Sequence, residues 1–234
     1  MATQAQKLYE QALEEFRDMA LKELKDSLRS FVVYGSVARR DADEDSDVDI
    51  LVITKASQSV KRRITEIRDE IQESHDYAVL LVPVYMTDKQ FIERTEQSDP
   101  LLINILREGI PLYDDGFFAA ARHHVPQVKR ETAERYLSEA QRRFAHVQEH
   151  QAHDDYTIMV QDAYKAGFFA AESIMLAQGR VPKGKHDLAN RFKQLGQLQK
   201  LSRKADALEA AEKEAVEAAA LAESLIDKAE VMLK

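Results

Sequence analysis

Apolar side chains at the start of the chain follow first a helical and then a strand-like spacing. Residues 4–28 carry an apolar side chain at every fourth position, which predicts an amphipathic helix. These side chains are Leu8, Ala12, Phe16, Ala20 and Leu24. The stretch from Phe31 to Ile53 then begins and ends with a run rich in Val and Ile, and each run predicts a strand.

The next segment alternates between the same two patterns. Inward-facing isoleucines predict a helix that ends near Ser74, and the apolar run over residues 77–86 predicts a strand. Pro83 within this run predicts an edge strand or a bulge, because proline cannot donate a hydrogen bond to a neighbouring strand. The segment closes with three short elements: a helix around Phe91, a helix over residues 100–107 and a strand over residues 110–113.

Beyond Phe117 the strand patterns stop and only helical spacing remains. Four helices separated by short breaks are predicted, over residues 124–151, 154–179, 186–200 and 203–233. Helices with short connections pack as an antiparallel bundle, and the turn signal Asp114-Asp115-Gly116 precedes them. We therefore expect an α+β protein, with a small mixed sheet in residues 1–120 and an all-α antiparallel four-helix bundle in residues 121–234.

The segment between the first two strands carries side chains suited to binding phosphate and metal. Gly35 at the end of a strand permits a tight turn and close approach to a ligand, and Ser36 with the next amides can form an anion cradle. Asp47 and Asp49 share one face of a strand, because side chains alternate along it. Two neighbouring carboxylates repel unless a hard divalent cation lies between them. We expect a nucleoside triphosphate on Gly35 and Ser36, with its magnesium on Asp47 and Asp49.

This pattern resembles the signature of the DNA polymerase beta-like nucleotidyltransferases, in which Gly-Ser, a spacer and Asp-x-Asp follow one another. Here the ten residues from Val37 to Ser46 separate Ser36 from Asp47. The resemblance implies that an acceptor hydroxyl attacks the α-phosphorus of a magnesium nucleoside triphosphate, with ATP as the first candidate. It also implies that Asp47 and Asp49 are catalytic metal ligands. Nucleotide contacts are expected from Gly35, Ser36, Arg39, Arg40 and Ser46.

The third carboxylate of that family is not evident in this sequence. The family places it on a later neighbouring strand, as a metal ligand or general base, but the run over residues 77–86 contains no acid. Asp76, directly before the run, is the first candidate for this catalytic role, and Glu73 is the second. The alternative is a non-catalytic, antitoxin-like nucleotide-binding module that works through contact with a partner.

The segment from Tyr164 to His186 resembles the HEPN superfamily of four-helix domains, which often partner small nucleotidyltransferases. The resemblance implies that the bundle supplies acceptor contacts, and we expect its apolar faces to mediate a homodimer. A small hydroxylated acceptor is conceivable because kanamycin nucleotidyltransferase has the same domain order, and a protein or tRNA acceptor is equally so, as in adenylylating antitoxins. Ribonuclease members carry a histidine shortly after an arginine, and none follows Arg203, so we expect no ribonuclease. The residues that carry the resemblance are Tyr164, Phe168 to Ala171, Gly179, Pro182 and Lys183.

Composition adds limits to these expectations. The net charge of -8 argues against tight, sequence-independent binding of duplex nucleic acid across the whole surface. No cysteine is present, which excludes disulfides, thiolate zinc sites and a cysteine nucleophile. The charged N-terminus is not a signal peptide and no apolar run approaches the length of a membrane span, so we expect no membrane contact and a cytoplasmic location.

Two weaker patterns have both a functional and an ordinary explanation. His146 and His150 lie one helical turn apart in an HxxEH string, with His153 as a third ligand for a metal, but the same pattern fits a polar helix face. The basic clusters over residues 61–63 and 142–143 fit a solvated helix face, or contact with a triphosphate or an RNA acceptor.

Overall fold

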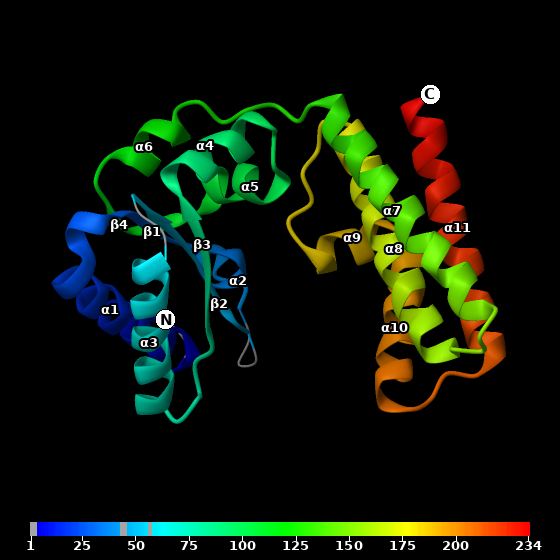
Figure 1. Ribbon diagram of the computed structural model, residues 1–234, viewed down its shortest axis with the longest axis horizontal. Coiled ribbons are helices and arrows are strands. Elements are labelled where there is room, and N and C mark those ends of the chain that lie inside the picture. The colour runs from blue at the N-terminus through cyan, green and yellow to red at the C-terminus, as the bar shows by residue number, and fades with distance from the viewer. Residues whose placement is uncertain (1–3, 43–45, 56–57) are drawn as a thin grey trace. The chain divides into compact units, whose positions relative to one another are not determined.

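The computed structural model describes residues 4–42, 46–55 and 58–234. The chain forms two compact units, Met1–Pro126 and Gln127–Lys234. The first contains a four-stranded sheet with helices, and the described part of the second contains helices alone (Figure 1). This arrangement confirms the predicted α+β class. None of the described helices combines the length and the apolar character needed to cross a membrane.

The sheet has the strand order β3-β2-β1-β4. Strand β1 runs antiparallel to both β2 and β4, whereas β2 and β3 are parallel. A parallel pair needs a crossover, and α3 provides it between β2 and β3. The strands are β1 (Leu28–Tyr34), β2 (Val48–Thr54), β3 (Leu81–Thr87) and β4 (Ile110–Asp114).

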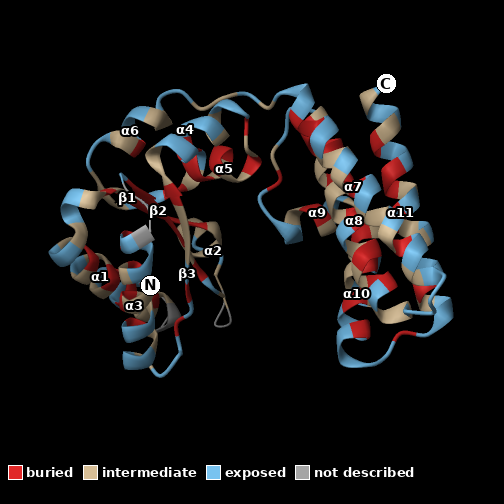
Figure 2. Ribbon diagram, in the orientation of Figure 1, coloured by how far each residue is buried: buried red, intermediate tan, exposed pale blue. Residues whose placement is uncertain are grey.

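The sheet separates two apolar cores, because neighbouring side chains on a strand point to opposite faces. Phe31 and Val33 of β1 enter a core with α1 and α3, while Val32 and Tyr34 enter a core with α4, α5 and α6. In Figure 2 the two central strands, β1 and β2, carry long buried runs, as expected for a sheet covered on both faces. The covering helices are α1 (Gln4–Leu24), α3 (Gln58–Ser74), α4 (Asp88–Glu96), α5 (Pro100–Glu108) and α6 (Phe117–Arg122).

Strand β3 begins four residues later than the sequence pattern predicts. The apolar run starts at Tyr77, but Asp76 and Tyr77 have φ angles of 50° and 58° and form a turn after α3. The chain therefore pairs with β2 only from about Leu80, and the strand itself starts at Leu81. Apolarity predicted the strand correctly, but the left-handed backbone of two non-glycine residues left no signal in the sequence.

The outer edge of β3 offers few free backbone groups. The Val48 N–H donates to the Leu80 carbonyl (2.8 Å). Leu80 and every second residue after it therefore direct their backbone groups toward β2. Leu81 and Pro83 therefore direct theirs outward. The Leu81 N–H donates to Gln72 Oε1 (2.9 Å), and Pro83 has no N–H to offer. The predicted edge position of Pro83 is confirmed, and this edge is poorly suited to pairing with another strand.

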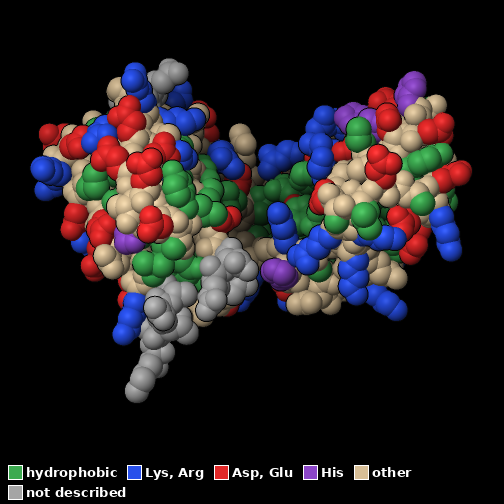
Figure 3. All heavy atoms as spheres, turned by 90° about the horizontal axis from the view of Figure 1, so that it is seen from below, with side chains coloured by type: hydrophobic (Ala, Val, Ile, Leu, Met, Phe, Trp, Pro, Cys, Tyr) green, Lys and Arg blue, Asp and Glu red, His purple; other side chains and the backbone are tan. Residues whose placement is uncertain are grey.

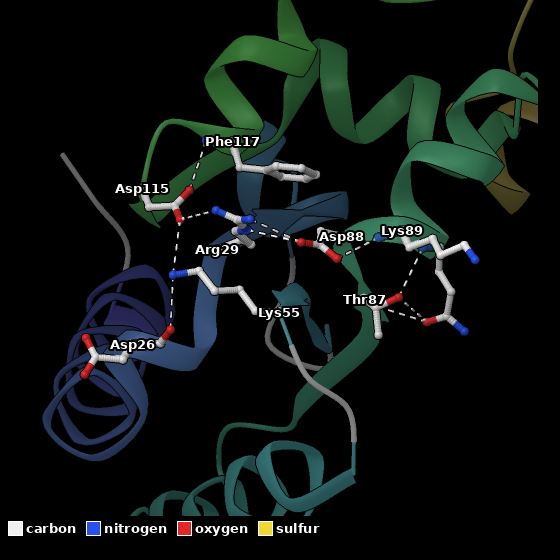
Figure 4. A network of polar contacts seen from close by, with 9 residues as sticks. Asp26, Arg29, Lys55, Thr87, Asp88, Lys89, Asp115 and Phe117 are labelled. Atoms are coloured by element: carbon white, nitrogen blue, oxygen red, sulfur yellow. Dashed lines mark hydrogen bonds and ion pairs between the residues drawn. The ribbon is translucent and has the colours of Figure 1, made fainter.

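The end of the sheet opposite Gly35 is held by a network around Arg29 (Figure 4). The Arg29 guanidinium donates to Asp115 Oδ2 (3.1 Å) and Asp88 Oδ2 (3.3 Å) and lies 5.6 Å from the centre of the Phe117 ring. Lys55 at the end of β2 lies 3.9 Å from the same Asp115 oxygen. These contacts join β1, α4 and α6, and every cation in them already has a partner.

The helical unit is built around α8. This helix packs against α7, α10 and α11, and its inward face is rich in alanine. A Cβ added at Gly167 of α8 would come within 2.5 Å of Leu198 Cδ1, so glycine permits the close approach of α10. The helices are α7 (Arg130–Gln151), α8 (Tyr156–Ala177), α9 (Lys185–Arg191), α10 (Lys193–Ala207) and α11 (Glu212–Leu233).

Two predicted helix boundaries in this unit are wrong. The helix predicted over residues 186–200 is divided at Phe192 into α9 and α10. The break predicted after residue 200 is absent, because Leu198, Ser202 and Ala205 continue a single buried stripe along α10. The chain leaves the helix instead at residues 208–211.

Candidate active site

Strand β1 ends at Tyr34, and the next residue, Gly35, lies against the carboxylate of Asp49 on β2. Gly35 opens the short helix α2 (Gly35–Arg39) and has a φ of 73°, in the left-handed region that glycine adopts without strain. A Cβ added at Gly35 would collide with the Asp49 carboxylate. Both the backbone conformation and the closeness of Asp49 therefore require glycine at this position.

Replacing Gly35 by Ala is expected to lower the free energy of unfolding by about 2–3 kcal/mol, because a strained φ and a collision act together. Gly179→Ala is the matched control, since Gly179 has a φ of 71° and open space around its Cα. We expect the control to lose only about 1 kcal/mol from strain. Urea unfolding of both variants measures the difference, and equal losses would contradict the contact with Asp49.

The two acids of the Asp-x-Asp sequence influence each other electrostatically. Asp49 lies within β2 and is half-buried, whereas Asp47 directly precedes the strand and is exposed. Burial raises the pKa of Asp49, the negative charge of Asp47 raises it further, and the positive charge of Arg39 acts in the opposite direction. A cation between the carboxylates would relieve this repulsion. Magnesium is commonly held by one or two carboxylates together with substrate phosphates, so the donor set fits this metal.

The residues paired with Asp49 on either side carry no charge. Tyr34 of β1 lies opposite Asp49 in the antiparallel register, and Val82 of β3 lies beside it in the parallel register. Burial raises the pKa of the Tyr34 phenol, and the charge of Asp49 raises it further, so the phenol stays neutral near pH 7. Val82 is an apolar side chain with 40% exposure. Nothing in the sequence assigns either residue to the site, and their position beside Asp49 follows only from the strand register.

The sequence around this site is similar to those of known proteins. A family model described as a nucleotidyltransferase domain matches residues 13–112, which include β1, α2 and β2. A candidate protein adenylyltransferase of Methanocaldococcus jannaschii is 35% identical over 72 residues, which are 31% of this chain and 73% of that protein. A second one from the same organism is 32% identical over 118 residues, 48% of this chain and 78% of that protein. The chain belongs to the nucleotidyltransferase family.

A solved structure shares the fold of this nucleotidyltransferase. Spectinomycin adenyltransferase AAD(9) from Enterococcus faecialis, crystallised with ATP and spectinomycin, has a TM-score of 0.55 and 11% sequence identity. The match covers 94% of this chain and 98% of that chain. The likeness at this identity concerns the fold alone, and it extends over both the sheet unit and the helical unit.

The structure does not bring Asp76 to the carboxylate pair of this nucleotidyltransferase. Asp76 is exposed in the turn after α3, and Glu73 is exposed near the end of that helix. Within the described residues, no three His, Asp or Glu side chains converge in a way that could hold a metal ion. The expectation that Asp76 completes the catalytic acids finds no support, because the chain turns at Asp76 and pairs with β2 only later.

The two arginines after the Gly-Ser pair differ in their surroundings. Arg39 is bound on both sides, by Glu108 Oε1 (2.9 Å from Nη1) and Asp41 Oδ2 (3.0 Å from Nε). Its charge nevertheless acts on Asp49, so it lies close enough to influence the site. Arg40 is exposed, has a φ of 61° and ends α2. Glu108 was not predicted, and its partner Arg39 is far away in sequence.

The serines of the predicted nucleotide site lie at its two borders. Ser36 is half-buried as the second residue of α2, and its carbonyl accepts the Asp41 N–H (3.0 Å). Ser46 is half-buried directly before Asp47. The intervening residues 43–45 lie outside the described part of the chain. The described neighbourhood therefore holds Gly35, Asp47 and Asp49 near one end of β1 and β2.

A cavity of about 580 Å³ lies between α1, α2 and β4. Its wall includes Tyr9, Leu13 and Val33, which belong to the core on the α1 side of the sheet. Asp49 and its partner Tyr34 lie on the other side, and neither Asp47 nor Ser36 lines the cavity. This cavity is therefore distinct from the carboxylate pair.

The weaker sequence patterns have structural explanations. His150 Nε2 lies 3.5 Å from Asp162 Oδ2, and no described metal cluster includes His146 or His153. The basic cluster around Arg63 is neutralised by acids on two helices, including Glu23 at 2.6 Å. Both arginines of the other cluster bind one acid: Arg142 and Arg143 donate to Glu139.

Proposed function

We propose that this nucleotidyltransferase transfers the adenylyl group of magnesium-ATP to a hydroxyl group of a protein. The observation that carries the proposal is the convergence of Gly35 with the acids Asp47 and Asp49, in a chain that belongs to the nucleotidyltransferase family. ATP is supported by the names of the relatives, which are candidate protein adenylyltransferases, and by the ATP-containing structure with the same fold. A small hydroxylated molecule and tRNA are the other acceptor classes to test.

In the proposed reaction the acceptor oxygen forms a bond to the α-phosphorus, and the bond from that phosphorus to the bridging oxygen breaks. Pyrophosphate leaves with the electron pair, and the hydroxyl proton passes to solvent. Such transfers depend mainly on positioning and charge neutralisation, so a strong general base is not required. Bound magnesium would supply that neutralisation.

The chain's own residues then have the following roles. Asp47 and Asp49 would hold the metal, and their mutual repulsion in its absence would favour its binding. Gly35 lets the Asp49 carboxylate lie directly against the turn between β1 and α2, because a Cβ at position 35 would collide with it. Phosphate contacts come from Ser36, Ser46, Arg39 and Arg40.

The helical unit is proposed to be a HEPN-like bundle that contacts the acceptor and forms a homodimer, and the protein is proposed to act in the cytoplasm. The long helices joined by short connections support the bundle assignment. The dimer is supported by exposed Val231 and Met232 at the end of α11, with 69% and 44% exposure.

A second function is favoured by one specific observation. Val82 of β3 lies beside Asp49, at a position from which an acidic side chain would reach Asp47 and Asp49. Among the described residues no third acid joins these two in a group that could hold a metal ion. Such a site could bind magnesium-ATP without turning it over. The chain would then be a nucleotide-binding, antitoxin-like module that works through a partner protein.

The test is incubation with each α-labelled nucleoside triphosphate, magnesium and three acceptor pools: cell protein, total tRNA and an aminoglycoside panel. We expect magnesium-dependent label transfer from ATP to protein, with release of pyrophosphate. Saturable ATP binding without transfer to any pool would favour the non-catalytic module. Transfer to tRNA or to an aminoglycoside would keep the reaction and change the acceptor.

A further inference from the structure

The second unit carries a concentration of positive charge that is separate from the carboxylate pair. Residues 180–204 contain eight Lys and Arg and a single acid, Asp187. Figure 3 shows blue side chains gathered on the helical unit. The eight form what we call the basic surface, and each is exposed: Arg180, Lys183, Lys185, Arg191, Lys193, Lys200, Arg203 and Lys204.

Most of these cations are not neutralised within the described chain. Arg191 donates to Asp187 (2.6 Å), and Lys204 is paired with Glu214. The other six side chains form no hydrogen bond or ion pair with any described residue: Arg180, Lys183, Lys185, Lys193, Lys200 and Arg203. The basic clusters at Arg63 and Arg143, by contrast, are bound by acids.

The cations of α10 form a continuous stripe. Lys193, Lys200 and Lys204 are spaced by seven and four residues, so they fall on one face of the helix over about 16 Å. Asp206 is the one acid in the sequence of α10, and its position in the helical repeat places it on the opposite side. The loop before α9 and α9 itself continue the positive charge, because only Phe192 separates α9 from α10.

The character of this surface favours a phosphate backbone over a protein partner. Protein interfaces have an apolar core of anchoring side chains. None of the large exposed apolar residues of the described chain lies within residues 180–204. Backbone phosphates repeat along a strand, and lysine and arginine bind them without the need for an apolar anchor. An elongated stripe of cations, in which Lys193 and Lys200 are unpaired, fits this ligand.

The charge of the whole chain would direct such a ligand to this unit. Residues 1–126 contain 16 basic and 24 acidic residues, which accounts for the entire net charge of -8. Residues 127–234 contain 17 of each, so their net charge is zero and the basic surface is a local excess. A polyanion is repelled by the first unit and attracted by α9 and α10.

We propose that the basic surface on α9 and α10 binds the phosphate backbone of a nucleic-acid strand. The contact is independent of base sequence, because lysines and arginines on an exposed helix face reach phosphates first. This function is additional to nucleotidyl transfer and does not depend on it. The Asp49→Asn variant should therefore bind nucleic acid as the unchanged protein does.

The test uses the full chain and fluorescence anisotropy with labelled single-stranded RNA, single-stranded DNA and duplex DNA of one length. We expect the logarithm of the binding constant to fall linearly with the logarithm of the salt concentration. For single strands the slope should be about -4, because the unpaired cations would neutralise about six phosphates. In Lys193→Glu/Lys200→Glu/Arg203→Glu the affinity should fall at least about tenfold and the slope should move to about -2. The three probes show whether one kind of strand is preferred.

The matched control is Arg135→Glu/Lys228→Glu/Lys234→Glu, which changes the net charge equally at exposed positions on α7, on α11 and at the C-terminus. Its affinity should change by less than about threefold if binding is local. Far-ultraviolet circular dichroism should show both variants folded, because all six positions are exposed. Absence of binding by the unchanged protein at low salt, or equal loss in both variants, would overturn the proposal.

Discussion

Replacing Asp49 by Asn is expected to lower transfer of the adenylyl group by about a thousandfold, equivalent to roughly 4 kcal/mol of transition-state stabilisation. Asn keeps the shape of Asp but removes the charge that would hold magnesium. The half-buried Asp49 carries a pKa raised by burial and by Asp47, so the neutral amide should be tolerated by the fold. The loss is expected in turnover, with the free energy of unfolding unchanged or higher.

The control for this result is Asp76→Asn, which makes the same chemical change at an exposed acid outside the pair. We expect its turnover to match that of the unchanged protein. The label-transfer assay measures both variants under identical conditions. Equal turnover in all three proteins would remove Asp49 from the mechanism, and a selective loss in Asp76→Asn would restore the role first expected for Asp76.

The second large effect is a gain. Replacing Val82 by Asp is expected to raise magnesium affinity at least about tenfold, about 1.4 kcal/mol, by adding a third carboxylate to the site. Val82 pairs with Asp49 in the parallel register, so its side chain lies on the same face, about 5 Å away. Because Val82 is 40% exposed on an edge strand, an acid should be accommodated without loss of the fold.

Val82→Asn separates charge from shape in this experiment, because Asn and Asp have nearly the same size. Magnesium affinity should rise in Val82→Asp and stay unchanged in Val82→Asn when ATP binding is titrated with the metal. Turnover should rise with affinity if the missing acid limits catalysis. The same magnesium affinity in both variants would show that position 82 does not reach the metal.

The local part of the site could be predicted from the sequence because its elements lie within one short stretch. Gly35, Ser36, Asp47 and Asp49 are joined by a single strand-helix-strand unit, so their spacing carries most of the geometry. The contact between Gly35 and the Asp49 carboxylate adds a reason for the glycine that spacing alone does not give.

The rest of the site depends on contacts between distant segments. The register that sets Val82 beside Asp49 follows from the positive φ angles at Asp76 and Tyr77, which shift the start of β3. Neither Asp nor Tyr favours a positive φ strongly enough for this turn to be predicted from the sequence. Glu108 likewise reaches Arg39 across 69 positions of sequence.

The basic surface was missed for a different reason. Its eight cations are distributed along residues 180–204 and contain no run longer than two. The short clusters that stood out in the sequence are neutralised by acids: Arg63 by Glu23 of α1 and by acids of its own helix, and Arg143 by Glu139 one helical turn away. Charge density along the sequence therefore does not show which cations remain unpaired, and only pairing in the folded chain distinguishes them.

The most direct test of the central claim is calorimetric titration of ATP, with and without magnesium, into the unchanged protein and three variants. We expect magnesium-dependent binding of ATP that is lost in Asp47→Asn and in Asp49→Asn and retained in Asp76→Asn, with all four proteins folded. Magnesium-dependent binding of equal strength in Asp47→Asn and Asp49→Asn would contradict the assignment of this pair as the metal and nucleotide site.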